Sequence, residues 1–264
     1  MPTEPRPENE NDRGDTPPIR LERVRYVVNG AAILDDVDLT VHRGEIFAVM
    51  GRSGVGKTTL LRLMMGLIPP ASGSIFINGE DITQMGEREL DRVRAGMGLV
   101  FQGAALFDSM TVGENVAVGL VEHRVVRREE VAGRVKRLLE MVDVAQATQL
   151  RPAELSGGMR KRVGVARALA MEPAIVLYDE PTAGLDPIYA TAIDNLIRSL
   201  RASMGVTSVI VSHDVVSLRR VCDRAALLHQ GRFLAVGTMA ELGRSDDPAV
   251  RQFLSGSLEG PMTE

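Results

Sequence analysis

Residues 51–58 read Gly-Arg-Ser-Gly-Val-Gly-Lys-Thr, which fits the pattern G-x-x-x-x-G-K-[ST]. Glycine permits backbone conformations that other residues avoid, so successive amides of such a loop can point inward and bind phosphate oxygens. A helix that begins at the loop adds the positive end of its dipole. Lys57 would place a charge between the β- and γ-phosphates of a nucleotide, and the Thr58 hydroxyl would bind Mg²⁺. The residues predicted to hold the phosphates are Gly51, Ser53, Gly54, Gly56, Lys57, Thr58 and Thr59.

The segments around this loop predict an α/β fold. A buried strand precedes the loop, a helix over residues 58–65 follows it, and short apolar strands recur along the chain as in a parallel sheet covered by helices. Those strands are predicted at residues 45–50, 73–78, 99–101, 174–178 and 208–211. Residues 21–28 and 33–41 flank the turn-prone Asn29-Gly30 and predict a neighbouring antiparallel pair. We expect a phosphate-loop NTPase core with a mainly parallel sheet, an antiparallel β subdomain and an inserted helical subdomain over about residues 85–170.

The composition excludes several classes of protein. The 31 Lys and Arg residues against 35 Asp and Glu give a net charge of -4, so no nucleic-acid partner is expected. A single cysteine, Cys222, excludes an internal disulfide and a cysteine-rich zinc site. No apolar run approaches the roughly 18 residues of a membrane-spanning helix. Residues 1–18 are polar and proline-rich, which predicts a disordered tail before an ATPase domain at 19–245 and a carboxy-terminal extension at 246–264.

Five further segments follow the loop in a fixed order. They are Phe-Gln at 101–102, Leu-Ser-Gly-Gly-Met at 155–159, Ile-Val-Leu-Tyr-Asp-Glu at 175–180, Gly-Leu-Asp at 184–186 and Ser-His-Asp at 212–214. Each alone is a weak signal, because a lone Ser-Gly-Gly is most often a flexible turn. Together, in this order and at this spacing, they resemble the Q-loop, signature, Walker B strand, D-loop and switch histidine of ABC ATPases. The resemblance covers about residues 21–230, and we therefore identify the chain as a member of that family.

The resemblance implies a role for each polar residue of these segments. Asp179, Thr58 and Gln102 would hold Mg²⁺, and Gln102 would sense the γ-phosphate or the metal. Glu180 would orient or deprotonate the attacking water, and His213 would hydrogen-bond the γ-phosphate and fix Glu180. Phosphoryl transfer to water needs mainly positioning and charge stabilisation, which these residue types supply.

The signature segment further implies a dimer. Ser156, Gly157 and Gly158 precede a helix that we expect to start near Met159, so they form a second anion site at a helix start. One nucleotide does not need two such sites in one chain, and the family's solution is a head-to-tail dimer with two ATP molecules at its interface. The partner is therefore predicted to be a second copy of this chain.

Two positions depart from the family pattern. Met159 replaces the usual glutamine, and the basic turn at residues 160–162 that follows could meet phosphate or permease or be solvated. Val28 stands where the family has an aromatic residue that stacks on adenine. Tyr26, two residues earlier, lies on the same face of a strand, so Tyr26 is the predicted adenine contact, with another residue as the alternative.

Local features indicate which transporter the chain serves. The signature with methionine, the loop at 101–107 and the ending at 247–254 resemble the ATPases of Mla/MCE phospholipid-transport systems. This resemblance implies separate membrane permease subunits, an MCE-domain lipid-binding protein as a further partner, and a place on the cytoplasmic face of the inner membrane. The alternatives are the ATPase of another import or export system and a soluble ABC protein outside transport.

Two segments lie outside the ATPase motifs. The loop at 103–110, with Leu106, Phe107 and Met110, is predicted to receive a permease helix or, alternatively, to pack within the helical subdomain. Asp247-Pro248 predicts a short helix whose stripe, Val250, Phe253 and Leu254, docks on its own subunit or on the opposite one.

Overall fold

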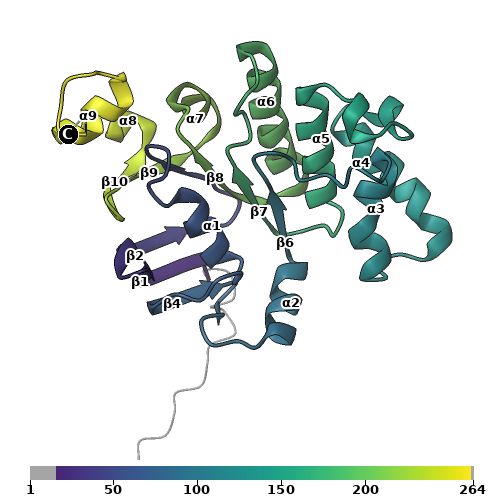
Figure 1. The fold of residues 1–264 in the computed structure, drawn as a ribbon, viewed down its shortest axis with the longest axis horizontal. Helices are drawn as coiled ribbons and strands as arrows, with labels where there is room; N and C mark the ends of the chain where they lie inside the picture. Colours follow the sequence, from purple (N-terminus) through teal and green to yellow (C-terminus); the bar gives the residue numbers. More distant parts are fainter. Residues whose placement is uncertain (1–15, 263–264) are drawn as a thin grey trace, which may run out of the picture.

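Two β-sheets form the centre of the molecule (Figure 1). The structure is a computed structural model, and it describes residues 16–262. Within these residues the larger sheet has the strand order β10-β9-β3-β8-β7-β6 and the smaller one the order β2-β1-β4-β5. The strands of the larger sheet are β3 (Ile46–Met50), β6 (Met97–Val100), β7 (Ile175–Asp179), β8 (Thr207–Ser212), β9 (Arg224–His229) and β10 (Arg232–Thr238). Those of the smaller sheet are β1 (Ile19–Val28), β2 (Ala31–Val41), β4 (Ser72–Ile77) and β5 (Glu80–Asp81).

The two sheets differ in the direction of their strands. In the larger sheet β9, β3, β8, β7 and β6 are parallel, and only β10 pairs antiparallel at the edge. In the smaller sheet every pair is antiparallel. The predicted core with a mainly parallel sheet and an antiparallel β subdomain is therefore confirmed.

Strand β3 shows how the parallel sheet separates two apolar cores. All five of its residues are buried, as expected for a strand covered on both faces. Ile46, Ala48 and Met50 join the core beneath the helices, whereas Phe47 and Val49 join the core between the two sheets. Because side chains alternate along a strand, this one strand contributes to both cores and fixes the position of the loop that follows it.

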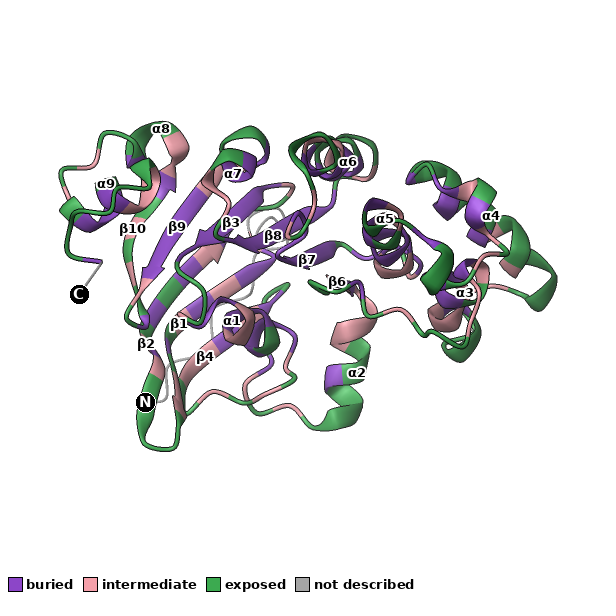
Figure 2. Cartoon of the chain, turned by 45° about the horizontal axis from the view of Figure 1, so that its top comes forward, coloured by how far each residue is buried: buried purple, intermediate pink, exposed green. Residues whose placement is uncertain are grey.

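The helices cover both faces of the larger sheet. Figure 2 shows its strands largely buried and the outer faces of the helices exposed. Helix α1 lies between the two sheets, and α3, α4 and α5 pack together as a group at one end. The helices of four residues or more are α1 (Lys57–Met64), α2 (Glu87–Ala95), α3 (Val112–Glu122), α4 (Val131–Met141), α5 (Gly157–Ala168), α6 (Pro187–Met204), α7 (Val215–Val221), α8 (Met239–Leu242) and α9 (Pro248–Ser255). No helix among residues 16–262 is long and apolar enough to cross a membrane.

The structure refines the predicted segment boundaries. The range 85–170 contains α2, α3, α4 and α5, but β6 lies inside it and belongs to the larger sheet. Residues 1–15 of the predicted disordered tail lie outside the described residues. Pro18, the last residue of that predicted tail, is instead part of the fold, because it is buried and its carbonyl accepts the N–H of Asn78 at 2.9 Å.

The carboxy-terminal helix forms where its sequence predicts a start. Asp247 caps α9 by accepting the N–H groups of Ala249 at 2.7 Å and Val250 at 3.3 Å. Val250 is fully buried in the core beneath the helices, and Phe253 and Leu254 pack against that core half-buried. In this chain the stripe therefore docks on its own subunit.

Candidate nucleotide site

The phosphate loop connects β3 to α1. A Cβ atom at Gly51 would lie 2.6 Å from the carbonyl oxygen of Leu228, so only glycine fits there without a shift of the backbone. Gly56 precedes α1 with a φ of +110°, in the left-handed region, and caps the helix without a side chain. Residues 52–54 of the loop are exposed, so they can meet a ligand beside the start of α1, a place that favours anions.

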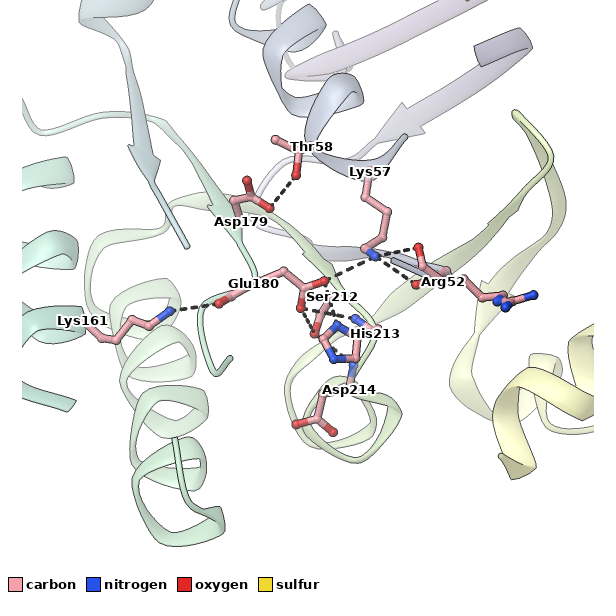
Figure 3. A network of polar contacts seen from close by, with 10 residues as sticks. Arg52, Lys57, Thr58, Lys161, Asp179, Glu180, Ser212, His213 and Asp214 are labelled. Atoms are coloured by element: carbon pink, nitrogen blue, oxygen red, sulfur yellow. Dashed lines mark hydrogen bonds and ion pairs between the residues drawn. The ribbon is translucent and has the colours of Figure 1, made fainter. Parts of the chain in front are cut away.

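Lys57 lies at the centre of a polar network (Figure 3). Its side chain is buried, and its Nζ donates to the carbonyl oxygens of Gly51 at 2.9 Å and Arg52 at 3.1 Å. The same Nζ lies 3.3 Å from Oε1 of Glu180. The structure therefore brings together the lysine of the loop and the second carboxylate of the predicted Walker B strand, 123 residues apart in sequence.

Thr58 and Asp179 form a pair of hard oxygen ligands. The Thr58 hydroxyl donates to Oδ1 of Asp179 at 3.0 Å. Burial raises the pKa of the Asp179 carboxyl, and the hydrogen bond from Thr58 acts in the opposite direction. A divalent cation beside these oxygens would favour the charged carboxylate. One hydroxyl and one carboxylate suit Mg²⁺, which usually keeps waters and nucleotide phosphates as its other ligands, so the residues fit the predicted metal.

Glu180 is held by β8 and the segment after it. Ser212 Oγ donates to Oε2 of Glu180 at 3.1 Å, and Nδ1 of His213 lies 2.9 Å from Oε1. The N–H of His213 also points at Oε2, at 3.4 Å. Glu180 itself has a φ of +47°, an uncommon conformation for a residue with a side chain. The carboxylate of Glu180 is therefore fixed by contacts to its side chain, on a residue whose backbone has an uncommon conformation.

The contact between His213 and Glu180 limits the proton positions on the ring. A carboxylate only accepts hydrogen bonds, so Nδ1 carries the proton in this arrangement. In the neutral ring Nε2 then accepts and cannot donate to a phosphate oxygen. His213 can donate to Glu180 and to a phosphate at the same time only as the imidazolium.

The signature residues occupy the start of α5. Ser156 caps the helix by accepting the N–H of Met159 at 3.2 Å, so α5 begins at Gly157, slightly earlier than predicted. Ser156 and Gly157 are exposed, whereas Gly158 is buried against the ring of Tyr189. Two of the three predicted phosphate contacts in this segment are thus free to meet another molecule.

Gln102 and the loop after it are fixed by neighbouring helices. Gln102 follows β6 and is exposed. Arg167 of α5 donates to the carbonyl oxygens of Ala105 at 2.6 Å and Ala104 at 2.8 Å. The fully buried Asn115 of α3 accepts the N–H of Phe107 at 2.7 Å. These bonds hold the loop in one conformation, with Phe107 49% exposed.

The other predicted loop residues do not share this exposure. Leu106 is half-buried and packs against the core beneath the helices, and Met110 is half-buried as well. Of the two alternatives for this loop, packing within the subdomain describes Leu106, and the exposure of Phe107 fits a contact surface.

Tyr26 lies on β1, in the smaller sheet. It is half-buried and packs against the core between the sheets, while Val28 is 40% exposed. The pairing of β1 with β2 shifts between Val24 and Tyr26 and again between Tyr26 and Val27. Both shifts place the extra residue on β2, so the alternation of β1 that puts Tyr26 and Val28 on one face is kept, and the adenine contact stays a prediction.

Sequence reasoning missed one residue of this site. Lys161 stands in the basic turn at 160–162, for which phosphate, permease or solvent contact was expected. It is instead 7% exposed, and its Nζ donates to the main-chain oxygens of Gln102 and Glu180. A lysine flanked by two arginines gave no signal of burial. Arg160, in contrast, is exposed, which fits the solvated alternative for this turn.

Known proteins share this sequence and fold. The family described as ABC transporter matches residues 34–183. The chain is 42% identical to the intermembrane phospholipid transport system ATP-binding protein MlaF of Escherichia coli, over 92% of this chain and 91% of that protein. It is also 42% identical to the methionine import ATP-binding protein MetN 2 of Rhodococcus jostii, over 92% of this chain and 73% of that protein. A dimeric ATP-binding cassette solved in a post-hydrolysis state with ADP and Pi has a TM-score of 0.77 and 31% identity, over 84% of this chain and 98% of that one.

These similarities agree with the site geometry. The family match covers more than half of the chain and includes both the phosphate loop and the Walker B strand. The expected fold, enzyme class and cofactors, ATP and Mg²⁺, are confirmed. The chain belongs to the ABC transporter family and is one of its ATP-hydrolysing subunits.

Proposed function

We propose that this chain hydrolyses ATP with Lys57, Glu180 and His213 in order to drive a separate membrane permease. The observation that carries the proposal is the convergence of these three side chains at the end of the phosphate loop (Figure 3). Bound Mg-ATP supplies the phosphoryl group and the metal charge. Lys57 offsets charge on the phosphates, and Glu180 orients and deprotonates the attacking water.

The remaining site residues position the nucleotide. The backbone amides of residues 51–56, which include Ser53 and Gly54, bind phosphate oxygens. Thr59 binds phosphate beside them, at the start of α1. Thr58 and Asp179 hold Mg²⁺. Gln102, which follows β6, contacts the γ-phosphate or the metal. Tyr26 stacks on adenine.

A second copy of the chain completes each nucleotide site. The exposed Ser156 and Gly157 at the start of α5 have the capping geometry of an anion site. In a head-to-tail dimer this helix start faces the phosphate loop of the opposite subunit, so that ATP lies in the interface. Binding of ATP then stabilises the closed dimer, and hydrolysis weakens it.

The transported molecule is a phospholipid. Support comes from the 42% identity with MlaF, which extends over nearly the full length of both chains. The partners are permease subunits and an MCE-domain lipid-binding protein, and the chain acts on the cytoplasmic face of the inner membrane. The half-exposed Phe107, on a loop fixed by α3 and α5, meets the permease.

Co-purification and reconstitution test this function together. The tagged chain is purified from membranes, its permease partner is identified, and the complex is placed in vesicles that contain a fluorescent phospholipid. ATP-dependent movement of that lipid is expected, and radiolabelled methionine serves as the alternative cargo because MetN 2 is equally identical in sequence. Recovery without any permease, or movement of methionine alone, contradicts the proposal.

A further inference from the structure

The ammonium group of Lys161 joins two catalytic segments at one edge of the sheet. Strands β6 and β7 run in parallel, with Val100 paired to Tyr178. Gln102 and Glu180 each follow that pair by two residues, so their carbonyl groups lie at neighbouring strand ends. Lys161 Nζ donates to both, at 3.1 Å for Glu180.

This bond acts on the backbone of Glu180, on the side away from Lys57. Figure 3 shows Glu180 between the two lysines, with Lys57 at the carboxylate and Lys161 at the carbonyl. The same carbonyl accepts the N–H of Ala183 at 3.2 Å, and the residue has a positive φ. A backbone in this uncommon conformation persists only where its surroundings fix it, and Lys161 supplies one of those contacts.

Lys161 also connects this carbonyl to the signature. It stands five residues after Ser156 on the same short helix, α5. A helix transmits a displacement along its length, so a shift of Ser156 moves Lys161 with it. Helix α5 packs against α3 and α4, hence the bond also joins that helical group to the ends of β6 and β7.

The burial of Lys161 indicates a specific role. Burial lowers the pKa of its ammonium, and the carboxylates of Glu180 and Asp179 act in the opposite direction. Placing a cation at 7% exposure is unfavourable unless its donors are satisfied. An apolar residue of similar length would fill this position without that cost, but it could not bridge two carbonyl groups.

We infer that Lys161 is a positioning residue for hydrolysis, which couples the signature helix to the backbone of Glu180 and to the Q-loop. The inference rests on the proposed role of Glu180. Its effect is expected on the chemical step, because Lys161 binds the segment that holds the water-activating carboxylate, and both of these hydrogen bonds go to residues outside the phosphate loop.

Steady-state ATP hydrolysis by the full chain tests the inference. Lys161→Met retains the apolar stem and removes the donors, and we expect kcat to fall about tenfold while KM for ATP stays within about twofold. Lys161→Arg can still donate to both carbonyls and should recover most of the lost kcat. Unchanged kcat in the methionine variant, an increase in KM alone, or an arginine variant no better than methionine overturns the inference.

Arg162→Met provides the matched control. Arg162 is the next residue of α5, and its Nη1 donates to the carbonyl of Val142 at 2.7 Å, within the helical group. This variant also removes a carbonyl-binding cation from α5, so kcat within about twofold of wild type is expected. An equal fall in both variants means that Lys161 only stabilises the helix, which rejects positioning.

Two further variants keep the outcomes distinct. If Lys161→Met does not fold, Lys161→Gln replaces it, because a shorter neutral amide cannot span both carbonyls. The same loss of kcat is expected in Lys161→Gln. A normal kcat in that variant rejects the inference. Glu180→Gln is assayed alongside. Wild-type turnover in Glu180→Gln rejects the proposed function, whereas an inactive Glu180→Gln with a normal Lys161→Met rejects only the positioning role.

Discussion

The starts of helices α1 and α5 place a buried lysine in different relations to the same glutamate. Lys57, the first residue of α1, lies beside the carboxylate of Glu180, and Lys161, within α5, binds its carbonyl. Helix α1 begins after a glycine in the left-handed region, whereas α5 begins after the side-chain cap Ser156. The first start forms one face of a site within the chain, and the second presents exposed groups outward.

This difference teaches how the two halves of a nucleotide site can be divided between subunits. The α1 start has its own carboxylates, Glu180 and Asp179, within reach. The α5 start exposes Ser156 and Gly157, and the ammonium of Lys161 within the helix binds the backbone carbonyl of Gln102. The proposed chemistry therefore lies at the α1 start, and in the proposed dimer the α5 start would contribute a ligand to the nucleotide of the opposite subunit.

Removal of the Lys57 cation is expected to have the largest effect. Lys57→Ala removes the charge that offsets the phosphates, so ATP hydrolysis should fall on the order of 10³-fold. Phosphate release from purified protein measures the loss, and circular dichroism checks the fold. Wild-type turnover in a folded variant would exclude the phosphate loop from the mechanism.

The Glu180→Gln variant separates binding from chemistry. The amide keeps the shape of the side chain but loses the charge and basicity needed at the water, so hydrolysis should fall about 10²-fold. ATP should then remain intact and hold a closed dimer. Size-exclusion chromatography is expected to show a stable dimer with ATP and a monomer with ADP. The same elution in both nucleotides contradicts the head-to-tail dimer.

Mixed dimers sharpen the comparison of the two helix starts. Lys57→Ala disables the α1 start, and Ser156→Arg blocks the α5 start, so each variant alone is expected to be nearly inactive. In a mixed dimer one site combines both defects and the other combines two intact halves. Mixing should therefore restore ATP turnover, up to about half the wild-type rate per dimer at one of two sites. If ATP turnover does not recover in mixtures that are shown to contain mixed dimers, the nucleotide site lies within one chain and is not shared between subunits.

The sequence predicted the α1 start far better than the α5 start, and the reason is physical. A phosphate loop is a contiguous motif whose glycines and lysine act on neighbouring backbone groups. Lys161, in contrast, depends on the packing of α5 against strand ends whose partner residues lie 59 and 19 positions away in sequence. No local pattern encodes such a contact.

The fold shows the same division. Strand β3 and the helix after the loop were predicted nearly to the residue, because apolar runs and turns are local signals. The hairpin of β9 and β10 was not predicted, although Gln230-Gly231 separates two apolar runs there. The half-buried position of Leu106 follows from its packing against the core beneath the helices and not from its own segment.

Phe107 offers a smaller effect that is confined to coupling. Phe107→Asp places a charge on the exposed side of the loop after Gln102, so transport by the reconstituted complex should fall about tenfold as an apolar contact is lost. ATP binding by the isolated chain should stay unchanged, since Asn115 and Arg167 still hold the loop backbone. A fluorescent ATP analogue measures binding. Loss of ATP binding together with transport would show that Phe107 is core and not a contact surface.

Tyr26 is expected to give the smallest effect. Stacking of a base on an aromatic ring contributes about 1 kcal/mol at the low end, which corresponds to about fivefold in KM. Tyr26→Ala should therefore raise KM for ATP about fivefold while kcat is unchanged, and Tyr26→Phe should behave as wild type. Because the ring also packs against the core between the sheets, the thermal midpoint of the alanine variant is measured in parallel. A lower thermal midpoint with an unchanged KM assigns Tyr26 to the core alone, so that another residue must contact adenine. Val28→Ala, at the exposed position on the same strand, is then measured in the same assay.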